Sequence, residues 1–595
     1  MTRIPLRPLA RILPARAAGQ SPEDIERENR TVRHEEMRDH ARQRAEGRLL
    51  VLGVFFFFAF AVVGVRMGLL ATSEPVEPRA SARGAAISAA RADIVDRKGR
   101  LLATNLETRA LYAQPPLMVD PIAAARGLVA IFPELDEKKL VKDFSGKRKF
   151  LWVKKKISPE QMQAVHDIGD PGLLFAPREM RLYPNGSLAA HVLGGASFGK
   201  EGVHAAEVIG VAGVEKYFDD YLRDPANGQK PLELSLDLTV QAAAERVLYG
   251  GMKIMNAKGA TSVLMDVRTG EVISVVSLPD FDPNTRPPAP VTGDQSDSPL
   301  FNRSVQGVYE LGSALKIFAA VQAVDLGIVT PSTMIDTSGP MRVGGANIGE
   351  FQGKNYGKLS VSDIIVKSSN RGTGRLALQI GAERQQEFLK SLGFFEPTPF
   401  EIIEARSGKP LWPKRWTELS TVTISYGHGM STSPMRLAAA YASIANGGYR
   451  VEPTILKQDS ASLGERVIGE AAAKSAREML RAVVTRGTAS MGEVPGYAVG
   501  GKTGTADKPK PGGGYYEDKI IATFAAMFPA YDPKYVLVVT LDEPVETSGD
   551  KPRRTAGWTS VPVAAEMIGR IAPLLGLRPT VEPVPLADIT LTRSN

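Results

Sequence analysis

Cysteine is absent from all 595 residues of the chain. This absence excludes disulfide frameworks, thiolate zinc sites, iron–sulfur clusters and cysteine nucleophiles. Histidine is scarce too, because only six occur and no two are spaced as a pair of metal ligands on one helix. We therefore expect neither a histidine-built metal site nor a Ser-His-Asp triad.

Positive charge is only slightly in excess of negative charge, and the net charge is +8. Nucleic-acid-binding surfaces concentrate basic residues, so we expect no nucleic acid partner. The densest basic segment lies between Lys138 and Lys156. It is interpreted as a solvated face or, as an alternative, as a contact with anionic lipid or a protein partner. The composition, 43% hydrophobic and 23% charged, is otherwise that of a globular protein.

One long apolar run stands near the N-terminus, at residues 49–71, and only Arg66 interrupts it. As a helix, the run would be about 35 Å long, enough to cross the hydrocarbon of a bilayer. We predict a single-pass transmembrane helix. A cleaved signal peptide is the competing interpretation, but 48 residues precede the run and an n-region of a signal peptide is usually far shorter.

Arginine is unevenly distributed around this run. Residues 29–48 contain six arginines and residues 72–91 contain three. The positive-inside rule then places the N-terminal arm, residues 1–48, in the cytoplasm and the rest of the chain on the other side of the membrane.

Two folded bodies are predicted beyond the run. A linker rich in Ser, Pro and Ala leads to the first body, within residues 72–231, and the second spans residues 232–577 with a tail at 578–595. In the second body, strand patterns occur near both ends, and helical patterns fill the middle. These strands are Ala260–Asp266, Glu271–Leu278, Ile521–Phe528 and Tyr535–Leu541. The pattern predicts an α+β fold whose sheet is closed by distant segments.

A serine and a lysine, Ser313 and Lys316, open an apolar helical segment just after Gly312. On a helix they would share one face, a turn apart. Burial and the positive helix terminus both disfavour the ammonium form, so the lysine could deprotonate the serine hydroxyl. By itself this spacing is common, and a capped helix is the plain alternative.

Two further polar motifs follow. Ser368-Ser369-Asn370 comes after a helical stretch; its first serine could relay a proton and Asn370 could hold a substrate amide and a lysine, unless the motif only caps a helix. The segment Lys502-Thr503-Gly504-Thr505 fits a strand with both threonine hydroxyls on one face, where they could bind a carboxylate. Gly504 would let the serine helix pack closely. The alternative is a glycine-rich turn.

Together and in this order, the three motifs resemble those of penicillin-binding proteins and class A β-lactamases. Other segments are similar to elements of class B penicillin-binding proteins, at residues 91–105, 181–194, 213–222, 309–320 and 424–448. Leu311 and Ala92 depart from the family pattern, which has proline and glycine at these positions. The resemblance implies a non-catalytic pedestal domain and a transpeptidase domain with an antiparallel sheet flanked by helices.

The resemblance further implies a serine D,D-transpeptidase that acts on peptidoglycan stem peptides and is acylated by β-lactams, without metal or cofactor. Ser313 would be the nucleophile and Lys316 its base. Ser368 and Asn370 would pass the proton to the leaving amine and hold the substrate backbone. The implied binding residues for the terminal carboxylate are Lys502, Thr503 and Thr505, and the amides of Ser313 and Thr505 would form the oxyanion hole.

Asn370 favours a member that acts in cell division, because the elongation-specific relative carries aspartate there. The implied partners are the inner membrane, a lipid-linked glycan polymerase of the SEDS type and other division proteins, with the catalytic domain in the periplasm. A β-lactamase lacks support because no Glu-x-x-Leu-Asn element follows the middle motif. A β-lactam sensor would need a larger cytoplasmic effector. A non-catalytic division scaffold remains an alternative, although all the motif side chains are present.

Overall fold

The computed structural model describes residues 9–19, 21, 23, 24, 27, 31, 51–67 and 91–580, except 202–205, 228–229 and 511. The chain divides into two compact units, Met1–Ser88 and Ala89–Asn595. Most of the predicted cytoplasmic arm, the linker at 72–90 and residues 581–595 of the predicted tail lie outside the described residues.

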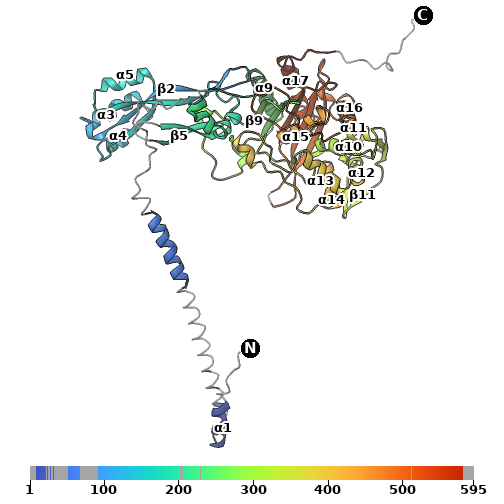
Figure 1. Ribbon diagram of the computed structural model, residues 1–595, viewed down its shortest axis with the longest axis horizontal. Helices are drawn as coiled ribbons and strands as arrows, with labels where there is room; N and C mark the ends of the chain where they lie inside the picture. The colour runs from blue at the N-terminus through green and yellow to red at the C-terminus, as the bar shows by residue number, and fades with distance from the viewer. Residues whose placement is uncertain are drawn as a thin grey trace. The chain divides into compact units, whose positions relative to one another are not determined.

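The first unit contains α1 (Leu9–Ala17) and a helix at residues 51–67, whose side chains are all exposed (Figure 1). Within the described part of the chain, no helix combines the length and the apolar character needed to cross a bilayer. The ends of the predicted span, residues 49–50 and 68–71, are outside the described residues.

The second unit begins with a mixed pedestal domain. Its main sheet has the order β3-β2-β1-β7, and β4 also pairs with β2. Three helices pack on one another and on β2 through a small apolar core that includes Leu111, Leu128 and Phe132. These elements are β1 (Ile94–Val95), β2 (Leu101–Ala113), β3 (Leu151–Ile157), β4 (Leu173–Leu182), β7 (Leu232–Glu233), α3 (Pro121–Ile131), α4 (Glu137–Phe144) and α5 (Pro159–Ile168).

The three helices begin where the sequence provides caps. Asp120 and Asp136 accept backbone N–H groups at the starts of α3 and α4, and Ser158 with Gln161 forms a capping box at α5. The remainder of the pedestal contains a hairpin and short helices. They are β5 (Gly195–Glu201), β6 (Ala206–Ala212), α6 (Ala190–Leu193), α7 (Gly213–Tyr217) and α8 (Asp219–Arg223).

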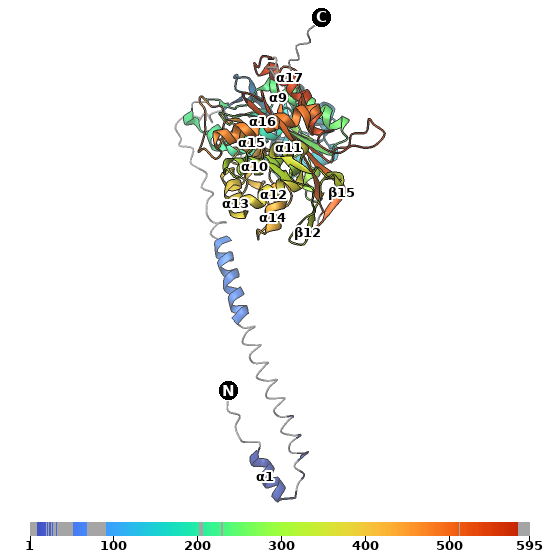
Figure 2. The same cartoon turned by 90° about the vertical axis from the view of Figure 1, so that its right-hand side faces the viewer.

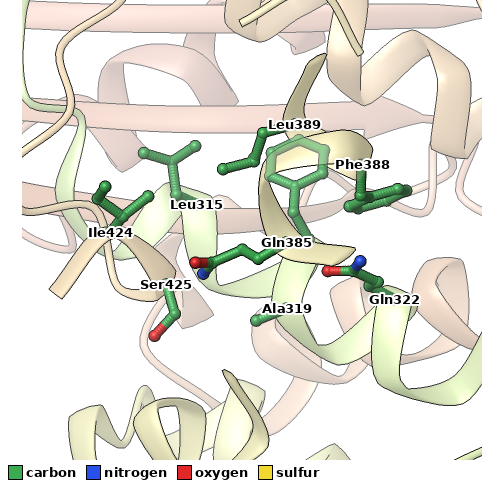
Figure 3. A pocket seen from close by; sticks show the side chains of 9 residues that line it. Leu315, Ala319, Gln322, Gln385, Phe388, Leu389, Ile424 and Ser425 are labelled. Carbon is green, nitrogen blue, oxygen red and sulfur yellow. The ribbon is translucent and has the colours of Figure 1, made fainter. Parts of the chain in front are cut away.

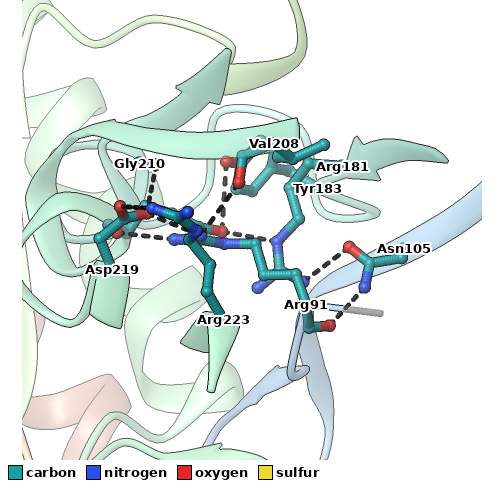
Figure 4. A network of polar contacts seen from close by, with 9 residues as sticks. Arg91, Asn105, Arg181, Tyr183, Val208, Gly210, Asp219 and Arg223 are labelled. Carbon is teal, nitrogen blue, oxygen red and sulfur yellow. Dashed lines mark hydrogen bonds and ion pairs between the residues drawn. The ribbon is translucent and has the colours of Figure 1, made fainter. Parts of the chain in front are cut away.

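A buried ionic network holds the first residues of the pedestal (Figure 4). The guanidinium of Arg91 donates to Glu215 and to Asp219, each at 2.7 Å. Arg181 donates to the other oxygen of Glu215 at 2.6 Å, and the Tyr183 hydroxyl donates to that oxygen at 3.3 Å. Because Glu215 is fully buried, these partners replace the contacts with water that its carboxylate loses on folding.

Strand β1 also connects the pedestal to the second folded body, because it runs parallel to β7, and the carboxylate of Asp96, the residue after β1, accepts the N–H of Leu238. The sequence LELSLDLTVQ from Leu232 alternates like a strand and predicts one there, but β7 has only two residues and α9 (Leu238–Ile254) starts soon after. Asp237 caps α9, so the local capping signal ends the strand pattern early.

The second body, residues 232–577, is built on a five-stranded antiparallel sheet of order β14-β15-β16-β8-β9, as the α+β prediction requires. Early and late parts of the chain meet where β8 pairs with β16. The strands are β8 (Gly259–Asp266), β9 (Val272–Leu278), β14 (Gly500–Pro509), β15 (Tyr515–Phe528) and β16 (Tyr535–Asp542). Strands β8, β9 and β16 are almost entirely buried, in agreement with their near-continuous apolar sequences.

Helices cover this sheet in two pairs. Helix α9 packs on α17 (Ser560–Leu574), and both contact the sheet; α15 (Pro434–Ala445) packs on α16 (Glu470–Arg486), and both contact the sheet as well (Figure 2). Every residue of α15 is buried. Further helices lie between β9 and α15 in the chain, and the first two of them contact α16. They are α10 (Lys316–Asp325), α11 (Val361–Lys367), α12 (Asn370–Ile380), α13 (Ala382–Ser391) and α14 (Glu418–Ser425).

Replacing Arg91 by methionine should lower the free energy of unfolding of the pedestal by about 3 kcal/mol, because Glu215 and Asp219 lose a buried counter-charge. Urea unfolding of the full chain measures this change. The matched control is Arg570→Met, which breaks an ion pair whose two side chains are each 56% exposed. The control should change stability by less than about 0.5 kcal/mol. Equal effects of the two substitutions would contradict the structural role of the network.

Candidate active site

The turn that carries Ser313 is a 3-10 helix, Gly312–Leu315, which leads directly into α10. Tyr441 fixes it by donating to the carbonyl of Ala314 at 2.7 Å. The turn lies directly against β14: a Cβ built on Gly312 would be 2.5 Å from the Thr505 carbonyl oxygen, and one on Gly504 would be 2.1 Å from the Leu311 carbonyl oxygen. Glycine at both positions therefore permits the contact.

The middle motif forms the break between α11 and α12. Ser368 has a left-handed backbone conformation (φ 61°, ψ 44°), and the Ser369 hydroxyl caps α12 by accepting the N–H of Gly372 at 2.9 Å. Glu350 is buried beneath this turn. It accepts the N–H groups of Asn370 at 2.8 Å and Arg371 at 3.1 Å, and also the Ser369 hydroxyl.

Glu350 was not predicted from the sequence. It comes from a different loop, twenty residues before the motif, and no spacing or periodicity relates the two. Its function is to hold the backbone that presents Ser368.

Two lysine amines meet at the hydroxyl of Ser368. The Nζ of Lys316 lies 3.1 Å from the Ser368 Oγ, and the Nζ of Lys502 lies 3.0 Å from it. Lys316 also donates to the carbonyl of Ser368, and Lys502 donates to the carbonyl of Thr503 at 3.1 Å. Both lysine side chains are completely buried. Segments almost two hundred positions apart thus converge on one oxygen.

Burial determines the protonation of these amines. Desolvation lowers the pKa of Lys316 to about 7, although the negative charge of Glu350 acts in the opposite direction. Desolvation, together with the charge of Lys316, also holds the pKa of Lys502 well below its usual value. Two buried ammonium ions on one hydroxyl would repel each other strongly, so near neutral pH at least one amine is neutral and can act as a base.

Some contacts differ from those expected. Among the described residues, the Ser313 hydroxyl has no hydrogen bond, because the Lys316 amine is directed at Ser368. The side-chain N–H of Asn370 donates to the carbonyl of Gly349 at 2.9 Å. Among the described contacts, its side-chain oxygen accepts no hydrogen bond from a lysine. The Thr503 hydroxyl bonds that of Thr488 at 2.8 Å, and Thr505 accepts the N–H of Ala556 at 3.1 Å.

A small pocket lies among α10, α13 and α14 (Figure 3). None of the candidate catalytic side chains lines it. Its walls are apolar apart from two glutamine side chains and a serine. They include Leu315, Phe318, Gln322, Gln385, Phe388 and Ser425. We regard this pocket as a packing gap, because the acid–base groups are all at the Ser368 turn.

Comparisons with known proteins agree with this arrangement. The model of the penicillin binding protein transpeptidase domain matches residues 260–564, and that of the penicillin-binding protein dimerisation domain matches residues 86–235. The probable peptidoglycan D,D-transpeptidase FtsI of Caulobacter vibrioides is 33% identical over 568 residues, which cover 93% of each chain. The chain belongs to the class B penicillin-binding proteins, and it is of the FtsI type.

Further class B penicillin-binding proteins are similar over most of their length. Peptidoglycan D,D-transpeptidase FtsI of Escherichia coli K12 is 27% identical over 522 residues, covering 83% of this chain and 85% of the relative. The crystal structure of penicillin-binding protein 3 from Mycobacterium tuberculosis complexed with aztreonam matches with a TM-score of 0.62 and 25% identity. That match covers 83% of this chain and 98% of the other.

Gly504→Ala should reduce acylation by fluorescent penicillin about 100-fold, because the new Cβ would meet the Leu311 carbonyl oxygen at 2.1 Å and displace the Ser313 turn. The control is Gly250→Ala in α9, where a Cβ has no atom within 4 Å. The control should be labelled at the wild-type rate. Wild-type labelling of the 504 variant would show that the turn and the strand need not touch.

Proposed function

We propose that this class B penicillin-binding protein is the D,D-transpeptidase that crosslinks peptidoglycan stem peptides in septal wall synthesis, with Ser313 as nucleophile. The observation that carries the proposal is the convergence of two buried lysine amines on the Ser368 hydroxyl, beside the turn of Ser313. The FtsI relatives from Caulobacter vibrioides and Escherichia coli are named peptidoglycan D,D-transpeptidases, which supports the same activity.

In the acylation step, the Ser313 oxygen attacks the carbonyl of the penultimate D-alanine while neutral Lys316 takes the hydroxyl proton. The negative charge that develops on the carbonyl oxygen is received by the N–H groups of Ser313 and Thr505. Each donor of this kind contributes about 3 kcal/mol in comparable acyl transfers. The backbone of Thr505 lies directly against the serine turn, which supports its part in this oxyanion hole.

The proton then has to reach the amine of the departing D-alanine. Ser368 is suited to relay it, because its hydroxyl lies between Lys316 and Lys502. The substrate carboxylate would bind Lys502 together with the hydroxyls of Thr503 and Thr505, by charge-assisted hydrogen bonds. An amine from a second stem peptide finally attacks the acyl-enzyme and forms the crosslink.

Substrate alignment is supported by the position of β14 at the edge of the sheet. In the described structure, β14 pairs with β15 only, so its other edge can accept a peptide as an added strand. Asn370, the last residue of the middle motif, would hold the backbone of that peptide after exchanging its contact with Gly349.

Division is favoured over elongation by Asn370 and by the names of the FtsI relatives. A non-catalytic scaffold is less well supported, because it gives no reason for burying two lysines. The proposed partners are a lipid-linked glycan polymerase of the SEDS type and other division proteins. β-Lactams are the proposed covalent inhibitors, and similar penicillin-binding proteins have been crystallised with aztreonam and ampicillin.

The proposed organisation follows the apolar run and the two family matches. Residues 49–71 would anchor the protein in the inner membrane, with the N-terminus cytoplasmic and the catalytic domain periplasmic. The proposed parts are a cytoplasmic arm at 1–48, the anchor, the pedestal at 72–231, the transpeptidase domain at 232–577 and a tail at 578–595. Family matches at 86–235 and 260–564 fall within the two proposed domains or extend a few residues beyond them.

Ser313→Ala should abolish covalent labelling by fluorescent penicillin, since the attacking oxygen is removed. Gel fluorescence and intact mass measure the labelling. The control is Ser332→Ala, which changes an exposed loop hydroxyl bonded only to Thr330 in the described structure. The control should be labelled normally. Persistent labelling of the 313 variant would discard the assignment of the nucleophile.

The rate of acylation should rise about tenfold between pH 6 and pH 8, because burial lowers the pKa of Lys316 to about 7 and only the neutral amine accepts the serine proton. Stopped-flow labelling with a penicillin that is stable over this range measures the profile. Glu350→Gln removes the charge that favours the Lys316 ammonium, so its midpoint should move to lower pH. A flat profile in the wild type would exclude Lys316 as the base.

A further inference from the structure

The hairpin of β14 and β15 projects beyond the catalytic sheet. Strand β16 reaches only as far as the pair Ile521–Asp542, so residues 515–520 have β14 as their only strand partner in the described structure. The hairpin turn contains Gly512, Gly513 and Gly514, all with positive φ and with open space around them. Because an isolated two-stranded ribbon is marginally stable, other contacts must fix its position.

One such contact lies on the sheet side of the hairpin. Lys508 donates to Asp542 at 2.8 Å and to Glu543 at 2.7 Å. Lys519 also forms an ion pair with Glu543 at 3.3 Å. These contacts hold the base of the projecting ribbon but leave its tip, near the glycine turn, without support from this side.

The tip is held from the other side by Glu310. Its carboxylate accepts the Tyr515 hydroxyl at 3.0 Å, the N–H of Gly429 at 2.8 Å and lies 3.2 Å from His428 Nδ1. The ring of His428 stacks on that of Tyr515, with centroids 5.0 Å apart and planes at 17°. Glu310 itself is only 9% exposed.

Glu310 also belongs to the segment that carries the nucleophile, because it stands three residues before Ser313. The turn at Gly427 packs against the same segment, since a Cβ at Gly427 would meet the Gly312 carbonyl oxygen at 1.9 Å. Burial and the Glu310 charge raise the pKa of Tyr515 to about 12, so its hydroxyl remains a donor at neutral pH. One carboxylate therefore joins the hairpin tip, the 427–429 turn and the serine turn.

We propose that Glu310, His428 and Tyr515 are positioning residues for acyl transfer: they latch the projecting hairpin against the Ser313 turn, and the latched state is the one that acylates rapidly. This proposal rests on the proposed transpeptidase function. The donor peptide adds along β14, so the position of the hairpin sets one wall of the cleft while the same carboxylate orients the nucleophile segment. None of the three side chains needs to touch the reacting atoms.

The test compares Tyr515→Phe, Glu310→Gln and the double variant in the full chain, with Tyr516→Phe as the matched control. Tyr516 is the next residue of the hairpin, and its ring lies near Lys510 and Lys519, away from Glu310. Acylation by fluorescent penicillin is measured over a range of concentrations, which separates non-covalent binding from the covalent step. Hydrogen exchange of the 512–520 amides and the thermal unfolding midpoint are measured on the same samples.

Each single latch variant should acylate about fivefold more slowly, which corresponds to about 1 kcal/mol, the typical net contribution of one hydrogen bond. The double variant should be no slower than Glu310→Gln alone, because that substitution already weakens the contact of Glu310 with Tyr515, along with those to Gly429 and His428. Exchange at 512–520 should be faster in the Tyr515→Phe variant with an unchanged thermal midpoint, whereas the Tyr516→Phe control should match the wild type.

Wild-type acylation and exchange in the Tyr515→Phe variant would overturn the latch, as would a double variant about 25-fold slower than wild type. If Glu310→Gln does not fold, the two tyrosine variants still decide the question. If the wild type itself is not acylated, the proposed function fails. The latch is then judged by hydrogen exchange alone, where equal protection at 512–520 in both tyrosine variants and the wild type overturns it.

Discussion

Two buried lysine amines on one partly buried hydroxyl form the constraint on which the catalytic body depends. Two ammonium groups this close repel each other, and burial removes the water that would screen them. The site is therefore stable only when at least one amine is neutral. That condition gives the site a base that works near neutral pH. The price is structural: several segments must exclude water from a polar point. Helix α10 is buried along most of its length, and the part of β14 that contains Lys502 is buried too.

The glycines and Glu350 serve the same constraint. Gly312 and Gly504 bring the serine turn and β14 into direct contact, and Lys316 and Lys502 both reach the Ser368 hydroxyl. Glu350 fixes the backbone of the middle motif and contributes the negative charge nearest to Lys316. The pedestal depends on a different interaction, the burial of Glu215 between two arginines, and it joins the catalytic body where β1 pairs with β7.

The sequence was sufficient for the α+β architecture and for the order of the three motifs. Strand pairs at both ends of the catalytic body have strong apolar patterns, and the antiparallel pairing of β8 with β16 follows once they share a sheet. The candidate site residues could be proposed because their type and order are unusual in combination, and the structure brings three of them together, Lys316, Ser368 and Lys502. Local patterns were less reliable where a cap competes with alternation, as at Leu232, where Asp237 starts a helix instead.

Residues that act through loop packing could not be predicted. Glu350, Glu310 and Tyr515 contact their partners only after distant loops have folded together, and a single sequence contains no periodicity that links such positions. The left-handed backbone of Ser368 is also invisible in the sequence, because serine has no strong preference for it. Some hydrogen bonds of the site differ from those expected from the sequence. Asn370 donates to the carbonyl of Gly349, and Lys316 donates to the carbonyl of Ser368.

The shared hydroxyl is tested most directly by a pH titration of the lysine side chains. NMR of the chain labelled at the lysine Cε carbon monitors the titration, and Lys316→Arg and Lys502→Arg variants assign the signals. The account predicts that the Lys316 signal titrates near pH 7, more than three pH units below an exposed lysine. Titration of both Lys316 and Lys502 above pH 10 would contradict it, because two ammonium ions would then share the Ser368 oxygen at neutral pH.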